Sequence, residues 1–105
     1  MAFTITDTIN DGIATFTLVG ELDASAAPAF REKIESASAA NVTQLVLNLG
    51  DLEYMSSAGL RVLIYAKQKM GTGVDIVLVD TQPMVRDTLQ KTGFNRSVRM
   101  VDSAA

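Results

Sequence analysis

The feature that most constrains the fold is a junction in the middle of the chain, where an apolar run passes into a serine-rich helix start. Residues 45–49, Leu-Val-Leu-Asn-Leu, have the composition of a buried strand. A short acidic turn with Asp51 and Glu53 follows, and Ser56 and Ser57 then precede a helical pattern. The junction predicts a strand that leads directly into a helix, as in open α/β sheets, where ligands and partners meet the carboxyl ends of the strands.

Two strand patterns precede this junction. Phe3 and Ile5 alternate with threonines, and residues 13–19 form a second alternating run that is rich in β-branched side chains. Asn10-Asp11-Gly12 lies between them and is a turn signal, because glycine tolerates a positive φ and Asn and Asp often do. We predict an antiparallel hairpin whose loop is longer than two residues.

The first helix is expected after Gly20-Glu21-Leu22-Asp23. Asp23 or Ser25 is the expected N-cap, and Pro28 suits a first turn because proline lacks the amide hydrogen that a later turn requires. Three apolar side chains recur at helical spacing and mark the inward face: Phe30, Ile34 and Ala37.

The second helix is expected to begin near Ser57 and to run to Met70. Gly71 follows its last turn, where glycine is favoured. Helical spacing predicts four core positions: Leu60, Leu63, Ile64 and Met70.

A further strand and a third helix follow. Residues 74–79 form a short apolar run, after which Thr81 is the expected N-cap and Pro83 lies in the first turn. Gly93 is expected to end this helix, with Phe94 making the apolar contact that often accompanies a glycine stop.

The chain closes with one more strand pattern at Val98 and Met100, and residues 102–105 are expected to form a loose tail. The element order is therefore β-β-α-β-α-β-α-β. We predict one α/β domain over residues 1–105, with an N-terminal hairpin, a mixed sheet of about five strands and three main helices. Strands that alternate with helices imply parallel pairing and right-handed crossovers.

The composition argues against several functional classes. The chain has 105 residues, no cysteine and no histidine, which removes thiol chemistry and the commonest general base and metal ligand. The net charge is −3 and the nine basic residues form no run, so we expect no direct nucleic-acid partner. The N-terminus lacks a signal-peptide pattern, and no apolar run has membrane-spanning length, so we expect a cytoplasmic protein without a membrane segment.

Motif searches give no catalytic or cofactor site. The Ser56-Ser57 turn lacks the G-x-S-x-G pattern of a hydrolase, although a hydrolase that uses Ser57 remains the alternative from the enzyme class. Gly71-Thr72-Gly73 is not followed by the lysine of a phosphate loop, and the acidic residues match no calcium loop. We therefore expect neither cofactor nor metal.

Two interpretations of Ser57 stay open on the residues alone. Serine is a preferred N-cap, and Ser56 or Ser57 would serve. Alternatively, the Ser57 hydroxyl is a modification site, because a helix N-terminus favours an anion and Gly59 permits close approach of the backbone.

Four sequence blocks resemble the STAS domain of bacterial anti-sigma factor antagonists. These are Gly20-Glu21-Leu22-Asp23, residues 45–49, Met55-Ser56-Ser57-Ala58-Gly59-Leu60, and Gly93-Phe94 after the last helix. The likeness covers nearly the whole chain. Many members have Asp where this chain has Ser56, and Ser or Thr where it has Ala58.

The resemblance implies a regulatory binding protein that is not an enzyme. In that family the unphosphorylated form binds an anti-sigma factor that is also a serine kinase, and so frees the kinase's target. Phosphorylation then ends binding, and a metal-dependent serine phosphatase restores it. The matching acceptor is Ser57, with Ser56 as second choice. The resemblance places these residues at the partner surface: Asp23, Ser56, Ser57, Ala58, Gly59 and Arg61.

A phosphate on Ser57 should leave the fold intact, because the positive end of the helix dipole lies beside it. We expect the added charge to oppose binding at a surface where Asp23, Asp51 and Glu53 are already negative. The alternative within the same fold is a STAS scaffold or adaptor of another signalling or transport complex, in which Ser57 is not a switch. Self-association stays open, since the edge strand of the hairpin offers unpaired backbone groups.

Overall fold

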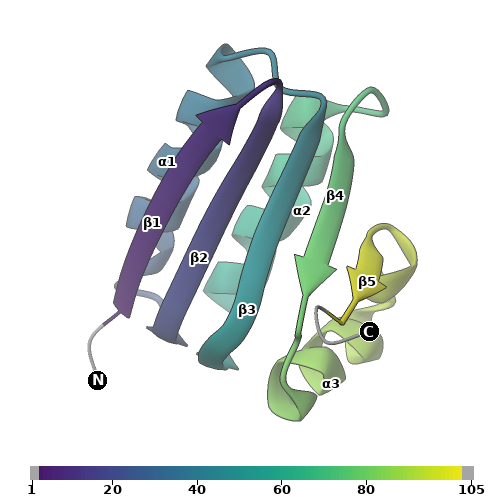
Figure 1. Cartoon of the computed structure of the whole chain (residues 1–105). Coiled ribbons are helices and arrows are strands. Elements are labelled where there is room, and N and C mark those ends of the chain that lie inside the picture. The colour runs from purple at the N-terminus through teal and green to yellow at the C-terminus, as the bar shows by residue number, and fades with distance from the viewer. Residues whose placement is uncertain (1–2, 103–105) are drawn as a thin grey trace.

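The computed structural model describes residues 3–102, and its strands and helices follow the expected order (Figure 1). The five strands are β1 (Phe3–Asn10), β2 (Ile13–Leu22), β3 (Gln44–Met55), β4 (Asp75–Val79) and β5 (Arg99–Val101). The helices are α1 (Ala27–Ala39), α2 (Ser57–Met70), α3 (Pro83–Thr92) and the short 3₁₀ helix η1 (Phe94–Arg96). No helix in this described part is long and apolar enough to cross a membrane.

The strands form one mixed sheet in the order β1-β2-β3-β4-β5. β1 pairs antiparallel with β2, and every later neighbour pair is parallel, which confirms the predicted α/β class. α1 and α2 lie side by side behind the sheet in Figure 1, and all three α-helices begin at its lower edge, where β2, β3 and β4 end. This edge therefore collects the carboxyl ends of three strands and the N-termini of three helices.

The core lies between the sheet and the helices. Alternate residues of β2 and β3 are fully buried on this side, as are the predicted inward residues of α1. The prediction for α2 was partly wrong: Ile64 and Met70 are only partly buried, whereas Val62 and Ala66 belong to the core.

β3 is longer than the predicted strand, and the expected acidic turn does not exist. Leu49, Leu52 and Met55 all face the core although they are three residues apart, which strict alternation forbids. The pairing of β3 with β2 shifts register twice, once after Thr17 and once after Gly20. At each shift β3 has one residue more than β2. These bulges restore the inward direction of each apolar side chain, so the strand continues through Asp51 and Glu53 to Met55.

The hairpin loop is shorter than predicted. Asn10 pairs with Ile13, which leaves a two-residue loop of Asp11 and Gly12. Both residues have positive φ, 52° and 79°, as a type I′ turn requires. The Asp-Gly dipeptide supplies that geometry directly.

Two predicted caps differ in the structure. The N-cap of α1 is Ala26, without a side-chain hydrogen bond, so neither Asp23 nor Ser25 holds that position. The N-cap of α3 is Gln82 and not Thr81, whose side chain is buried. Gly93 ends α3 in the left-handed conformation as predicted, and Phe94 is buried after it.

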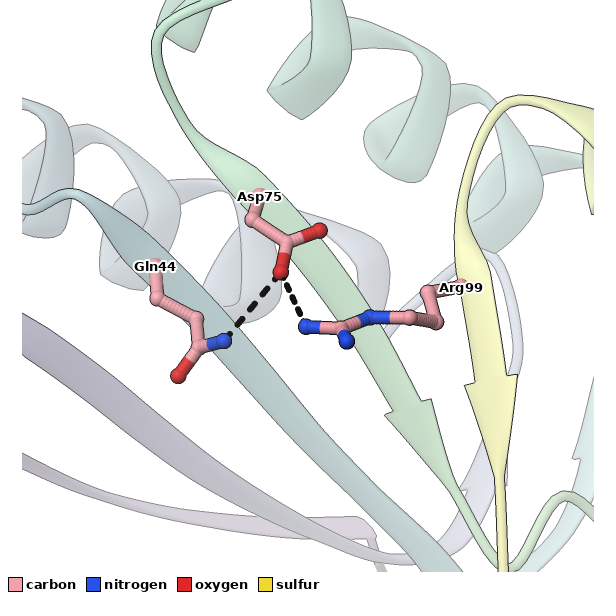
Figure 2. A network of polar contacts seen from close by, with 3 residues as sticks. All are labelled: Gln44, Asp75 and Arg99. Atoms are coloured by element: carbon pink, nitrogen blue, oxygen red, sulfur yellow. Dashed lines mark hydrogen bonds and ion pairs between the residues drawn. The ribbon is translucent and has the colours of Figure 1, made fainter.

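Neither α1 nor α2 covers the second face of the sheet, which carries a polar network across three strands. The Asp75 carboxylate accepts a hydrogen bond from Gln44 Nε2 at 3.2 Å and pairs with the Arg99 guanidinium, in front of the sheet in Figure 2. β5 begins one residue after the predicted Val98 and contains Met100. Of the expected tail, residues 103–105 lie outside the described range.

Candidate functional site

Ser56 caps α2 and joins it to the end of β2. Its Oγ accepts a hydrogen bond from the Gly59 amide at 3.2 Å and donates one to the Leu22 carbonyl at 2.9 Å. The Ser56 amide also donates to that carbonyl at 2.9 Å. The cap is therefore Ser56, and its hydroxyl is already engaged as both donor and acceptor. Asp would be an equally good cap at this position, so the choice of serine costs the helix start no capping function.

Ser57 occupies the first helical position and is exposed. Its hydroxyl makes no hydrogen bond within the described residues 3–102. Since Ser56 satisfies the Gly59 amide, the amides of Ser57 and Ala58 are the first-turn donors left to face an anion. The cap interpretation of Ser57 is therefore wrong, since Ser56 is the N-cap and the Ser57 hydroxyl is exposed.

Gly59 fits α2 against β2. A Cβ atom at Gly59 would lie 2.7 Å from Leu22 Cγ and 2.8 Å from its Cδ2. Gly59 is buried, which differs from the exposed position expected of a residue that contacts a partner. Gly59 therefore acts by letting the backbone of α2 approach Leu22 of β2 closely, as the sequence suggested.

Asp23 orders the loop between β2 and α1. Its Oδ1 accepts hydrogen bonds from Ser25 Oγ at 2.7 Å and from the Ala26 amide at 3.0 Å. The bond from Ser25 has the largest effect on the Asp23 carboxyl, and the bond from the Ala26 amide adds to it. Both hold the pKa of this carboxyl below its usual value, and Asp23 is charged at neutral pH. Asp23 follows Leu22, whose carbonyl binds Ser56, so the Gly-Glu-Leu-Asp block and the serine turn meet at this point.

Asp51, a second expected negative charge, is placed differently. Asp51 pairs in register with Val19, whose exposed side chain lies on the open face of the sheet. Asp51 is exposed there too, on the side away from the helix that Ser57 begins. The negative surface around Ser57 therefore lacks Asp51.

Ala58 and Arg61 border a groove between α1 and α2 that the sequence did not indicate. Val62 and Tyr65 also line it from α2, and the rest of its lining comes from α1 and the preceding loop, about thirty positions away in the sequence, so no local pattern reveals it. Two exposed apolar side chains were also missed: Tyr54, 41% exposed, near the end of β3, and Met84, 61% exposed, in the first turn of α3.

Replacing Ser56 should destabilise the fold through the loss of the cap. We expect Ser56→Ala to lower the free energy of unfolding by about 1 kcal/mol, since it also removes the donor to Leu22. Ser36→Ala, at an exposed position within α1, is the matched control and should leave stability within about 0.5 kcal/mol. Urea unfolding of both variants measures the difference, and equal stabilities would show that Ser56 is not the cap.

Comparisons with known proteins agree with this architecture. The STAS domain family model matches residues 4–105. The putative anti-sigma factor antagonist BtrV of Bordetella bronchiseptica is 38% identical over 89 residues, which cover 80% of this chain and 73% of BtrV. The anti-sigma-F factor antagonist RsfB of Mycobacterium tuberculosis is 29% identical over 99 residues, covering 94% of this chain and 81% of RsfB.

The fold is also similar to that of the anti-sigma factor antagonist SpoIIAA, which has been solved in two states. The unphosphorylated form matches with a TM-score of 0.81 and 27% identity, over 97% of this chain and 88% of SpoIIAA. The phosphorylated form from Bacillus matches with a TM-score of 0.75 and 26% identity, over 97% and 91%.

Proposed function

The chain belongs to the STAS domain family, and we propose that it is an anti-sigma factor antagonist controlled by phosphorylation of Ser57. The unphosphorylated form binds an anti-sigma factor that is also a serine kinase, and thereby releases the target of that factor. Phosphorylated Ser57 ends the interaction, and a metal-dependent serine phosphatase reverses it. Because such partners act on the transcription machinery, the proposal places the protein in the cytoplasm.

The contrast between the two serines carries this proposal. Ser56 makes two hydrogen bonds through its hydroxyl, whereas Ser57 is exposed at the helix start and its hydroxyl is unengaged within the described range. A kinase therefore reaches the Ser57 oxygen without breaking the cap. Transfer forms a bond between Ser57 Oγ and the γ-phosphorus of ATP, breaks the bond to ADP and releases the hydroxyl proton.

The same arrangement suits a binding protein and not a catalyst. Ser57 lacks a histidine partner because the chain contains no histidine, so a serine–histidine nucleophile cannot form. An ester-hydrolysis assay with a Ser57→Ala control tests this point. Hydrolysis that depends on Ser57 would contradict the binding-protein assignment.

Phosphate incorporation tests the proposed acceptor. The protein is incubated with ATP and each candidate anti-sigma kinase from the same genome, and incorporated phosphate is measured per chain. We expect one phosphate in the wild type and none in Ser57→Ala. Ser56→Ala and Ser25→Ala, which keep Ser57, should still be labelled. Labelling that persists in Ser57→Ala would move the site to another serine.

A further inference from the structure

A groove of about 340 Å³ lies between α1 and α2, and its lining includes Ala58, the residue that follows Ser57. Its floor is mainly apolar: Ala24, Ala27, Pro28, Ala58 and Val62. The groove exists because three of these side chains are single methyl groups, which leave the space between the two helices unfilled. Its volume is at the small end of protein binding pockets, which suits one or two side chains of a partner.

One wall of the groove is fixed by a network that spans both helices. The Arg31 guanidinium carbon lies 4.2 Å from the centre of the Tyr65 ring. Tyr65 Oη donates a hydrogen bond to Glu35 Oε2 at 3.0 Å, and Arg31 Nε lies 3.7 Å from the same oxygen. The charge of Arg31 is therefore balanced within this wall.

One helical turn before Tyr65, α2 also carries a cation that has no ion pair within residues 3–102. Arg61 lines the groove from α2, is exposed and makes no ion pair with any residue between 3 and 102. It lies one helical turn after Ser57, so the two side chains share one face of α2. The groove thus combines an apolar floor with one arginine that has no ion pair within residues 3–102, one helical turn from the proposed switch.

We propose that this groove seats an apolar side chain of the anti-sigma factor, with a carboxylate of the same partner segment bound to Arg61. This inference rests on the proposed function and adds the chemistry by which the partner is recognised. The apolar floor excludes a purely ionic ligand, and the free guanidinium selects an acidic segment over a basic one. A phosphate on Ser57 competes for Arg61, because residues four apart on a helix form ion pairs. Arg61 therefore links the groove to the switch.

Calorimetric titration with the anti-sigma factor that phosphorylates this chain tests the groove. Arg61→Glu reverses the free charge, and Ala24→Trp fills the floor from an exposed position. Each should weaken binding by about 10- to 100-fold, as for central interface residues. Arg86→Glu and Ala39→Trp make the same changes at exposed positions outside the groove and should bind as the wild type does. Circular dichroism verifies that each variant is folded.

A second measurement uses the unmodified sequence. The methyl NMR signals of Ala24, Ala58 and Val62 should shift when the unlabelled anti-sigma factor is added, whereas that of Ala39 should not. Unchanged groove signals, or wild-type affinity in both groove variants, would overturn the groove proposal. The proposed function would still stand in that case if Ser57→Asp lost binding. If no candidate anti-sigma factor bound the wild type, both proposals would fall.

Discussion

Phosphorylation of Ser57 is expected to weaken binding to the anti-sigma factor by about a hundredfold to a thousandfold without unfolding the protein. The phosphate adds about −1.5 to −2 charges at an exposed helix start, where the helix dipole favours it by about 0.3–1 kcal/mol. The fold therefore tolerates the group. Within a partner interface, the same charge must be desolvated beside Asp23, at a cost of about 3–4 kcal/mol, which corresponds to that loss of affinity.

Variants separate charge from the loss of the hydroxyl. Ser57→Ala should bind as the unphosphorylated wild type does, and Ser57→Asp should fall between the two states because it adds only one negative charge. Thermal melts followed by circular dichroism should show phosphorylated and unphosphorylated protein unfolding within a few degrees of each other. A large loss of secondary structure on phosphorylation would show that the switch works by unfolding and not at the surface.

Gly59→Ala is expected to destabilise the protein by about 1–3 kcal/mol, although alanine is the better helix former. The new methyl group would lie 2.7 Å from Leu22 Cγ, and Leu22 is fully buried and has little room to move. The strain is centred where the Leu22 carbonyl holds Ser56, so the first turn of α2 should shift and Ser57 should be phosphorylated more slowly.

Gly73→Ala is the matched control, because a Cβ atom at Gly73 meets nothing within 4 Å. It should change the free energy of unfolding by no more than about 0.5 kcal/mol. In the double variant Leu22→Ala with Gly59→Ala, the clashing side-chain atoms are absent, so the cost should be smaller than the sum of the two single costs. Additive costs, measured by urea unfolding, would contradict the predicted contact.

The sequence predicted most of the fold because its local signals agree with the tertiary structure. Alternation in residues 13–19 and the spacing of Phe30 and Ile34 each have a single interpretation, and Gly93 allows the left-handed conformation that ends α3. The element order and the mixed sheet follow from these signals. The errors in β3 and the hairpin loop arose where pairing between strands decides the geometry. Bulges break the two-residue period in β3, and register alone shows that Asp11 and Gly12 form the whole loop.

The candidate site was predictable only in part, for the same reason. The residue types at 56–59 indicated a helix start, but serine at either position satisfies the capping pattern. The bond from the Gly59 amide to Ser56 Oγ assigns the cap, and the contact of Ser56 with the Leu22 carbonyl, 34 residues earlier, holds Ser56 in that position. The groove likewise depends on small side chains of α1 and α2 that come together in space. Contacts of this range leave no periodic signal in the sequence.

One sample carried through phosphorylation and then dephosphorylation tests the central claim most directly. The affinity of the protein for its anti-sigma factor is measured before phosphorylation, after complete phosphorylation, and after dephosphorylation by a metal-dependent serine phosphatase. The account predicts tight binding, then binding about a hundredfold to a thousandfold weaker, then a return to the first value, with the phosphate found on Ser57. An affinity that stays constant through the cycle would contradict it.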